Sequence, residues 1–431
     1  MKIVIVGNGV AGITCALEIR RLDSAASITV VSGETDYFFS RTALMYAYMD
    51  QMARRDLEPF ERGFYAEQRI ALRRGWVVDL DADARVLRLD DGSTVPYDRL
   101  VLATGAVPNR FPWSGLDEVR DGVVHFVSMQ DLDACERLTP TTRQAVVVGG
   151  GLIGIELVES LRHHGVDVTF LVREPWYWPM ALGREEADMV TEHLRAHGVQ
   201  VALEEEIASV HADASGRVSH TLTSKGRSLP CQMLGIAVGV RPAVDRMRSF
   251  TSAPKLGRGV VVNERLETSL PYVWACGDCA WIEPESGAPS FGELIWYSAK
   301  RQGLLAAANV LGARQAYTPP LFFNSSKFFE IEYTTVGAVM NAPPTATTVY
   351  RRLPGKPVSQ RIVIDGGVVI GFNMLGSRWD HERLEQWVHE RRSEAWVLAH
   401  LHEAQYDVEF GQAPLRAMVE QRLPLHEGQG A

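Results

Sequence analysis

Residues 145–156 read AVVVGGGLIGIE, and this stretch decides the fold. Its four apolar residues predict a buried parallel strand. Gly149, Gly151 and Gly154 follow in the order G-x-G-x-x-G, and Leu152 to Arg162 can continue as a helix. In such a turn one glycine allows the tight bend, one lets the backbone approach a pyrophosphate, and one permits close helix–strand packing. The new helix then presents its N–H groups and positive dipole end to the phosphates.

The same pattern stands at the start of the chain. Residues 1–12 read MKIVIVGNGVAG, with Gly7, Gly9 and Gly12 at the same spacing. One unit of this kind can be a purely structural strand–helix corner. Two units about 140 residues apart predict two dinucleotides that face each other. The expected fold class is therefore α/β, with two Rossmann-like dinucleotide-binding domains and a C-terminal α+β domain.

Length and composition limit the class of protein. A chain of 431 residues is too long for one ordinary core, so two or three domains are expected. Hydrophobic content of 46% and charged content of 23% are typical of a soluble globular protein. The net charge of -9 argues against nucleic acid as a partner. No run approaches the roughly 20 apolar residues of a membrane helix, so no membrane partner is expected.

The N-terminus and the cysteines indicate a compartment. The first strand begins at Lys2, which leaves no room for a signal peptide. Five scattered cysteines are too few for a secreted disulfide framework. A cytoplasmic enzyme is therefore the expectation.

Further elements follow the first glycine turn. A strand is expected at Ser27 to Val31, and Glu34 lies just past it, 22 residues after Gly12. An acidic residue there can accept hydrogen bonds from a ribose, although a solvated loop carboxylate is the alternative. Antiparallel β structure is expected over residues 76–89, and a short buried strand ends at residues 103–105.

The second unit has a matching plan. Its second strand, Val168 to Val172, is followed directly by Arg173 and Glu174. Residues 231–242, which include Gly239, mirror the end of the first unit. The expected domains are a discontinuous first dinucleotide-binding domain, a second dinucleotide-binding domain and a C-terminal α+β domain. Their expected bounds are 1–117 with 246–320, 118–245, and 321–431.

With these motifs in order, the chain resembles the FAD-dependent pyridine nucleotide–disulfide oxidoreductase superfamily. Within it, the chain is most similar to the branch of ferredoxin and rubredoxin reductases and apoptosis-inducing factor. The resemblance covers nearly the whole chain. It implies that the first glycine turn, the acid after the second strand, an arginine on the loop beside the flavin, and the A-T-G and Gly-Asp motifs hold FAD. These FAD-binding residues are Gly7, Gly9, Val10, Ala11, Gly12, Glu34, Arg41, Ala103, Thr104, Gly105, Gly277 and Asp278.

The resemblance also assigns residues to NAD(P)H and to the flavin edge. A tryptophan followed by A-x-x-Q-G is expected at that edge, here Trp296, Ala299, Gln302 and Gly303. The expected NAD(P)H-binding residues are Gly149, Gly151, Leu152, Ile153, Gly154, Arg173, Glu174 and Gly239. NADH enzymes usually carry an acid after the second strand, and NADPH enzymes an arginine. Arg173 and Glu174 give evidence both ways, so the prediction is NAD(P)H without a choice between the two.

One carboxylate is expected near the nicotinamide. Glu156 follows the third glycine by two residues, and in family members it is often paired with a flavin-facing lysine. Here Tyr46 takes the lysine's position. Without another partner, Glu156 would be half-buried with a raised pKa. Lys327 is the candidate substitute cation, and an ordinary surface lysine is the alternative. The expected catalytic residues are therefore Glu156, Lys327 and Trp296.

The cysteine pattern narrows the chemistry. Cys276 and Cys279 form a C-x-x-C, but they lie inside the Gly-Asp turn, where small residues pack. No second C-x-x-C completes a zinc site, so no metal is predicted. Relatives that use thiols place a C-x4-C pair after the first unit or one cysteine on the arginine loop, where residues 39–42 read FSRT. A thiol relay through that loop is excluded.

Three functions remain open at this point. The first is an NAD(P)H-dependent reductase of a small electron carrier, such as a rubredoxin or ferredoxin. The second is an NAD(P)H oxidase or a reductase of a small-molecule acceptor. The third is a redox-gated interaction protein like apoptosis-inducing factor. The resemblance also implies a homodimer formed through the C-terminal domain, whose dense aromatics are either core or a docking surface.

Overall fold

The computed structural model describes residues 1–406 and 418–424, which form two compact units. Unit 1 consists of Met1–Phe111, His125–Arg137 and Val238–Pro319, and unit 2 of Pro112–Val124, Leu138–Ala237 and Pro320–Ala431. The tail therefore groups with the second glycine turn, and the expected three-domain bounds stay a prediction. Within the described ranges, every helix is too short or too polar to cross a membrane.

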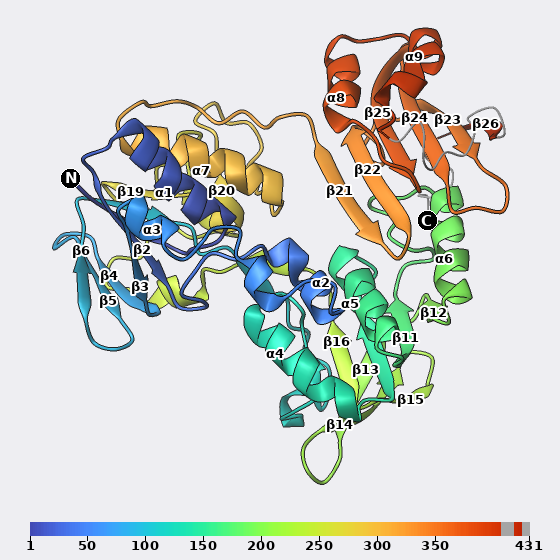
Figure 1. Cartoon of the computed structure of the whole chain (residues 1–431), viewed down its shortest axis with the longest axis horizontal. Helices are drawn as coiled ribbons and strands as arrows, with labels where there is room; N and C mark the ends of the chain where they lie inside the picture. Colours follow the sequence, from blue (N-terminus) through green and yellow to red (C-terminus); the bar gives the residue numbers. More distant parts are fainter. Residues whose placement is uncertain (407–417, 425–431) are drawn as a thin grey trace. The chain divides into compact units, whose positions relative to one another are not determined.

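Unit 1 is built on a five-stranded parallel sheet in the order β19-β7-β1-β2-β3 (Figure 1). The chain enters it at β1, whose residues after Lys2 are all buried. Such continuous apolar strands are typical of parallel sheets covered on both faces. The bounds are β1 (Lys2–Val6), β2 (Ser27–Ser32), β3 (Ile70–Arg74), β7 (Arg99–Leu102) and β19 (Val273–Ala275).

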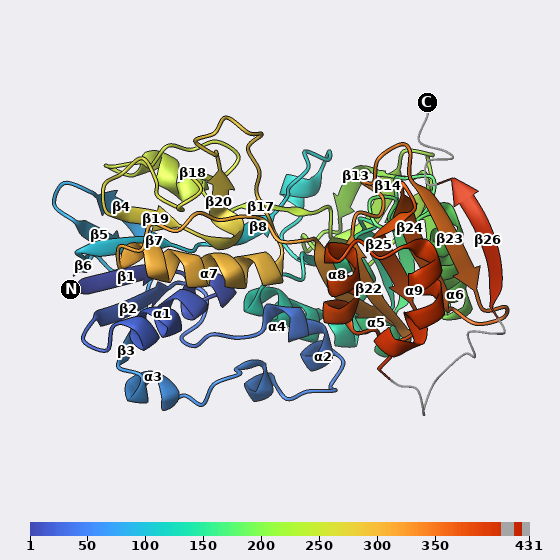
Figure 2. The same cartoon turned by 90° about the horizontal axis from the view of Figure 1, so that it is seen from above.

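Two helices of unit 1 lie side by side against this sheet. They are α1 (Val10–Leu22) and α7 (Trp296–Val310), and they run along each other in Figures 1 and 2. Small residues allow this approach, because a Cβ on Gly303 would lie 2.5 Å from the carbonyl oxygen of Ala11.

Unit 1 also contains antiparallel strand pairs and several short strands and helices. The expected antiparallel structure is confirmed as the sheet β4-β5-β6, and β8 pairs with β17. Short helices cover the loop around Arg41 and the segment after His125. The bounds are β4 (Val77–Asp81), β5 (Val86–Leu89), β6 (Thr94–Pro96), β8 (Ala106–Pro108), β17 (Val240–Pro242), β18 (Val260–Val262), β20 (Ala280–Ile282), α2 (Leu44–Tyr48), α3 (Phe64–Glu67) and α4 (Met129–Leu138).

Unit 2 repeats the parallel plan. Its five-stranded sheet has the order β12-β11-β10-β16-β9, and a separate sheet joins β13, β14 and β15. The second glycine turn connects β10 to α5, as the sequence predicts. The bounds are β9 (Val123–Val124), β10 (Gln144–Val148), α5 (Leu152–His163), β11 (Asp167–Val172), α6 (Arg184–Ala196), β12 (Gln200–Leu203), β13 (Ile207–Ala212), β14 (Val218–Thr223), β15 (Ser228–Pro230) and β16 (Met233–Ile236).

The tail confirms the α+β expectation. Its antiparallel sheet has the order β21-β22-β25-β24-β23-β26, and α8 and α9 pack on it. Helix α8 ends before α9 begins, because Arg391 has a left-handed φ of 54° and the Ser393 side chain caps a new helix. The bounds are β21 (Phe323–Phe328), β22 (Ile331–Gly337), β23 (Thr347–Arg352), β24 (Ser359–Asp365), β25 (Val368–Leu375), α8 (His381–His389), α9 (Glu394–His400) and β26 (Val419–Pro424).

A buried ion pair ties this tail to α6. The Arg361 side chain on β24 is 2% exposed and Glu186 on α6 is fully buried. Arg361 Nε lies 3.2 Å from Glu186 Oε1, and its Nη2 lies 2.6 Å from Glu185 Oε2. Buried charges persist only when they are paired and hydrogen-bonded. This pair joins the tail to α6 within unit 2.

Candidate functional site

The first glycine turn has the geometry of a pyrophosphate cradle. Gly7 has a φ of +112°, and a Cβ there would lie 2.1 Å from the Ala103 carbonyl oxygen. A Cβ on Gly12 would lie 2.0 Å from the Gly7 carbonyl oxygen. Gly9 differs, because a Cβ there meets nothing within 4 Å. The outer glycines are therefore needed by the fold, while the middle one leaves open space at the N-terminus of α1.

The second turn repeats these three roles. Gly149 has a φ of +113°, and a Cβ on Gly154 would lie 2.1 Å from the Gly149 carbonyl oxygen. A Cβ on Gly151 meets nothing within 4 Å, and Leu152 and Ile153 open α5 beside it. Two open backbone cradles, each at a helix N-terminus, fit two dinucleotide pyrophosphates.

Glu34 lies just past β2, where the sequence predicts a ribose ligand. Its carboxylate forms a bidentate ion pair with Arg41, with distances of 2.7 Å and 3.0 Å. The backbone N–H of Met129 also donates to it, at 3.2 Å, and Arg41 donates to the Val127 carbonyl oxygen. A carboxylate has about four acceptor positions, so the pair leaves room for a ribose hydroxyl. Two residues expected to bind FAD thus lie in contact.

The A-T-G and Gly-Asp motifs lie beside the first turn. Ala103 and Thr104 directly follow β7, and a Cβ on Gly277 would lie 2.7 Å from the Ala11 Cβ. The Gly277 N–H donates to the Gln302 side-chain oxygen at 2.9 Å. Burial raises the pKa of Asp278 to about 6, and the charge of Arg41 opposes this shift.

The structure therefore brings most expected FAD residues together at one edge of the unit 1 sheet. Val10 and Ala11 belong to the first turn of α1, and Gly105 follows Thr104, whose hydroxyl donates to the Ala243 carbonyl at 3.1 Å. Trp296 is the first residue of α7, and the Lys300 ammonium lies 5.5 Å from the centroid of its ring.

Glu156 is partly buried on α5, one turn before Glu159. Burial raises the pKa of Glu156 to about 8, and repulsion from Glu159 adds to the shift. The raised pKa expected from the sequence is confirmed. At neutral pH the Glu156 carboxyl is therefore mostly protonated and can donate a hydrogen bond.

Lys327 lies on β21, and its positive charge lowers the pKa of Glu159 on α5. Burial raises the pKa of Glu159, while the Phe329 N–H, which donates to it at 2.6 Å, and the charge of Lys327 lower it. Lys327 thus acts one helical turn away from Glu156. Its role as the substitute for a flavin-facing lysine stays a prediction.

The residues expected to select the nicotinamide are exposed. The Arg173 side chain is 65% exposed, and its Nε donates to Glu174 Oε1 at 2.8 Å. A salt bridge between the two candidate ribose-side groups keeps the choice between NADH and NADPH open. Gly239, expected at the NAD(P)H site, falls in unit 1, where its carbonyl accepts from the Asn109 N–H at 3.0 Å.

The structure confirms that the two cysteines of the C-x-x-C pattern pack in the interior. All five cysteines are buried and outside any disulfide, and Cys276 and Cys279 have no exposed surface. The Cys279 thiol donates to the carbonyl oxygens of Leu102 and Cys276, each at 3.4 Å. Burial raises the pKa of both thiols, so neither is a ready thiolate nucleophile.

Two clusters in unit 2 were not expected from the sequence. One is the Arg361–Glu186 pair, and the other joins His193 and His197 of α6 to Glu330. The H-x-x-x-H spacing on a helix was the one signal for the second cluster, because it places both imidazoles on the same face.

Two parallel sheets, each with a glycine turn open to a pyrophosphate, define an oxidoreductase that binds two dinucleotides. A family model described as "Pyridine nucleotide-disulphide oxidoreductase" matches residues 1–303. The chain belongs to the pyridine nucleotide-disulphide oxidoreductase family. It is an FAD-dependent NAD(P)H oxidoreductase.

Relatives support this assignment, and one solved structure has the same fold. The chain is 31% identical to the benzene 1,2-dioxygenase system ferredoxin–NAD(+) reductase subunit of Pseudomonas putida, covering 72% of this chain and 74% of that protein. It is 28% identical to the NADH oxidase of Methanocaldococcus jannaschii, covering 89% and 90%. The fold matches that of a covalent putidaredoxin reductase–putidaredoxin complex with a TM-score of 0.81, at 22% identity, covering 95% and 99%.

Some relatives are longer. The chain spans 36% of the assimilatory nitrate reductase electron transfer subunit of Bacillus subtilis, to which it is 28% identical over 65% of its own length.

Proposed function

We propose that this chain takes hydride from NAD(P)H and passes electrons to a small redox carrier protein of the rubredoxin or ferredoxin type. The observation that carries the proposal is that the cysteine thiols are buried and absent from the loop around Arg41. All five cysteines are buried and none forms a disulfide, and the loop at residues 39–42 holds no thiol. Reducing equivalents therefore have no sulfur relay and must leave from the flavin itself. The ferredoxin reductase among the relatives supports the same acceptor class.

The residues of the chain supply binding and proton control. FAD, when bound, accepts a hydride equivalent and can release electrons singly or in pairs. The cradle at Gly9 would hold its pyrophosphate, with Glu34 toward the ribose. The cradle at Gly151 would hold the nicotinamide dinucleotide. Glu156 would hold a proton on its carboxyl at neutral pH, which makes it a donor in the unit that binds the nicotinamide.

A second function is favoured by one comparison. The NADH oxidase relative aligns over nine-tenths of both chains. In that case oxygen or a small organic molecule would take the electrons from the flavin.

Anaerobic stopped-flow absorbance separates the two functions. The protein is loaded with FAD and reduced with NADH or NADPH. It is then mixed with a rubredoxin, a [2Fe–2S] ferredoxin, or oxygenated buffer. We expect rapid flavin reoxidation by a carrier and slow reoxidation by oxygen. Fast oxygen consumption with no carrier reduction would replace the proposal with the oxidase.

A Cys276→Ala variant tests the absence of a thiol route. We expect its flavin to be reduced and reoxidised at the rates of the unaltered protein, because the buried thiol takes no part. Loss of carrier reduction in this variant, with FAD still bound, would contradict the proposed route.

We further propose a cytoplasmic homodimer that binds no nucleic acid. The net charge of -9 opposes binding to a phosphate backbone, and the free cysteines suit a reducing compartment. Light scattering of the FAD-loaded protein tests the oligomeric state, and a mass of one chain at working concentration would remove the dimer.

A further inference from the structure

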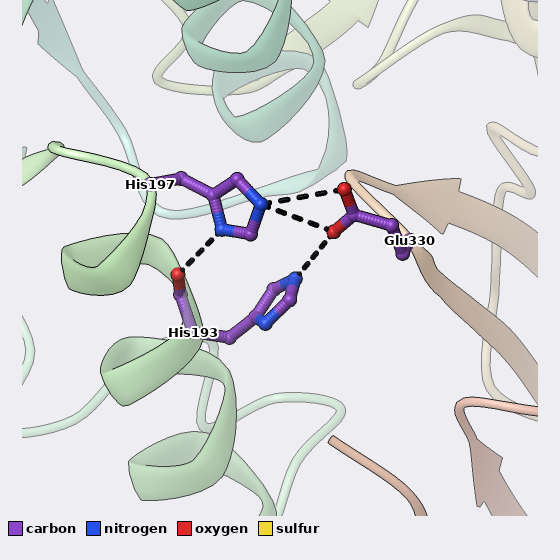
Figure 3. A group of neighbouring side chains, drawn as sticks. All are labelled: His193, His197 and Glu330. Atoms are coloured by element: carbon purple, nitrogen blue, oxygen red, sulfur yellow. Dashed lines mark hydrogen bonds and ion pairs between the residues drawn. The ribbon is translucent and has the colours of Figure 1, made fainter. Parts of the chain in front are cut away.

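Three metal-ligating side chains converge in unit 2. His193 and His197 lie one turn apart on or just after α6, and Glu330 lies at the tip of the β21–β22 hairpin (Figure 3). One ligand atom from each residue lies within 4.8 Å of the other two. Helix and hairpin tip are more than 130 residues apart in sequence, so the fold brings the three groups together.

The distances suit one shared ion. His193 Nε2 lies 2.8 Å from Glu330 Oε2, and His197 Nε2 lies 3.2 Å from the same oxygen. The two imidazole centroids are 4.4 Å apart. Ligand atoms about 2.1 Å from a tetrahedral Zn²⁺ lie roughly 3.4 Å from one another. A small adjustment of the exposed Glu330 side chain would therefore open a tetrahedral site.

A hydrogen bond of His197 fixes which of its ring nitrogens faces Glu330. His197 Nδ1 is 2.9 Å from the His193 carbonyl oxygen, which can only accept, so Nδ1 carries the proton. This leaves Nε2 to face the Glu330 carboxylate. A carbonyl contact of this kind is also what orients metal-binding histidines.

We propose that His193 Nε2, His197 Nε2 and a Glu330 carboxylate oxygen form a binding site for a divalent transition metal of the Zn²⁺ class. Two imidazoles and one carboxylate are a ligand set that zinc accepts, with a fourth position left for water. Ions can reach the site from solvent, because the Glu330 side chain is 68% exposed and that of His197 is 33% exposed.

The surrounding contacts give such an ion a structural consequence. Phe329, next to Glu330, has a left-handed φ of 49° and its ring lies 4.8 Å from that of His197. The Phe329 N–H donates to Glu159 on α5. A bound metal would therefore clamp the hairpin tip to α6 and, through Glu159, to the helix that opens at the second glycine turn.

Metal titration of the FAD-loaded chain without a histidine tag tests the site. The protein is treated with a chelator and titrated with Zn²⁺ by calorimetry, and with Co²⁺ by visible absorbance. We expect one ion per chain, with tetrahedral Co²⁺ absorption bands. Glu330→Gln and His193→Ala should each lower the affinity by at least about tenfold. His211→Ala, which changes a histidine outside the cluster, is the control and should bind the ion unchanged.

Hydrogen exchange gives a readout independent of redox activity. Zn²⁺ should slow amide exchange over residues 323–337 in the unaltered protein and not in Glu330→Gln. Because Glu330 is exposed, this variant should fold even if His193→Ala does not. Absence of Co²⁺ bands, or equal affinity in the unaltered protein and Glu330→Gln, would overturn the proposal and leave an ordinary ion-paired cluster.

Discussion

Replacing Glu156 with glutamine should change how stability depends on pH. Burial raises the pKa of Glu156 from 4.5 to about 8 in the folded chain. Between these values the folded state binds a proton that the unfolded state has lost, so the free energy of unfolding falls as pH rises. This loss is absent below the unfolded pKa and complete above the folded pKa.

The size of the effect follows from the shift. About 3.5 pKa units at about 1.4 kcal/mol each give an upper value of about 5 kcal/mol. Glu156 is only partly buried, so solvent screening lowers this to roughly 2–3 kcal/mol. Glutamine has nearly the same shape and no charge. The variant should therefore match the unaltered protein near pH 4.5 and exceed it in stability by roughly 2–3 kcal/mol above pH 8.

Denaturant unfolding of both proteins across this pH range measures the difference. Glu192→Gln, on the exposed face of α6, is the matched control and should show no such trend. A constant difference between Glu156→Gln and the unaltered protein at every pH would refute the reasoning, because it would mean that Glu156 ionises normally in the folded chain.

Arg361→Met should lower the free energy of unfolding by about 3–5 kcal/mol, since Glu186 would remain buried without its partner. Adding Glu186→Leu should recover much of this loss, and denaturant unfolding measures both effects. Gly151→Val should leave stability and FAD content unchanged, because a Cβ at this position meets no protein atom. It should abolish nicotinamide binding, because the side chain fills the phosphate position. Gly9→Val should instead prevent FAD binding. Flavin absorbance and nucleotide titration distinguish them, and normal flavin reduction in Gly151→Val would contradict the assignment of the second turn. Lys327→Ala should slow flavin reduction in stopped flow, and an unchanged rate would remove its predicted role.

The strands and helices around both glycine turns were predictable because their signals are local. A short apolar run, three glycines at fixed spacing and an amphipathic helix define the unit without knowledge of the rest of the chain. The same holds for the burial of Cys276 and Cys279, which follows from their place within a strand–turn motif.

The clusters in unit 2 could not be predicted because they depend on distant segments. Arg361 and Glu186 are 175 residues apart (361 minus 186), and neither reads as buried from its neighbours. The neighbours of Lys327 were equally hard to predict from the sequence. Its charge lowers the pKa of Glu159, an effect that depends on how the hairpin packs against α5, and its predicted place beside the flavin stays a prediction.

The ion pair between β24 and α6 has a consequence for engineering. A chain cut before residue 320 would remove Arg361, the counter-charge of Glu186, and expose surface of unit 2 that the tail covers. The tail is thus not a detachable module. Chimaeras that swap it between homologous reductases should exchange α6 and β24 together as one cassette, or the recipient will inherit an orphaned charge.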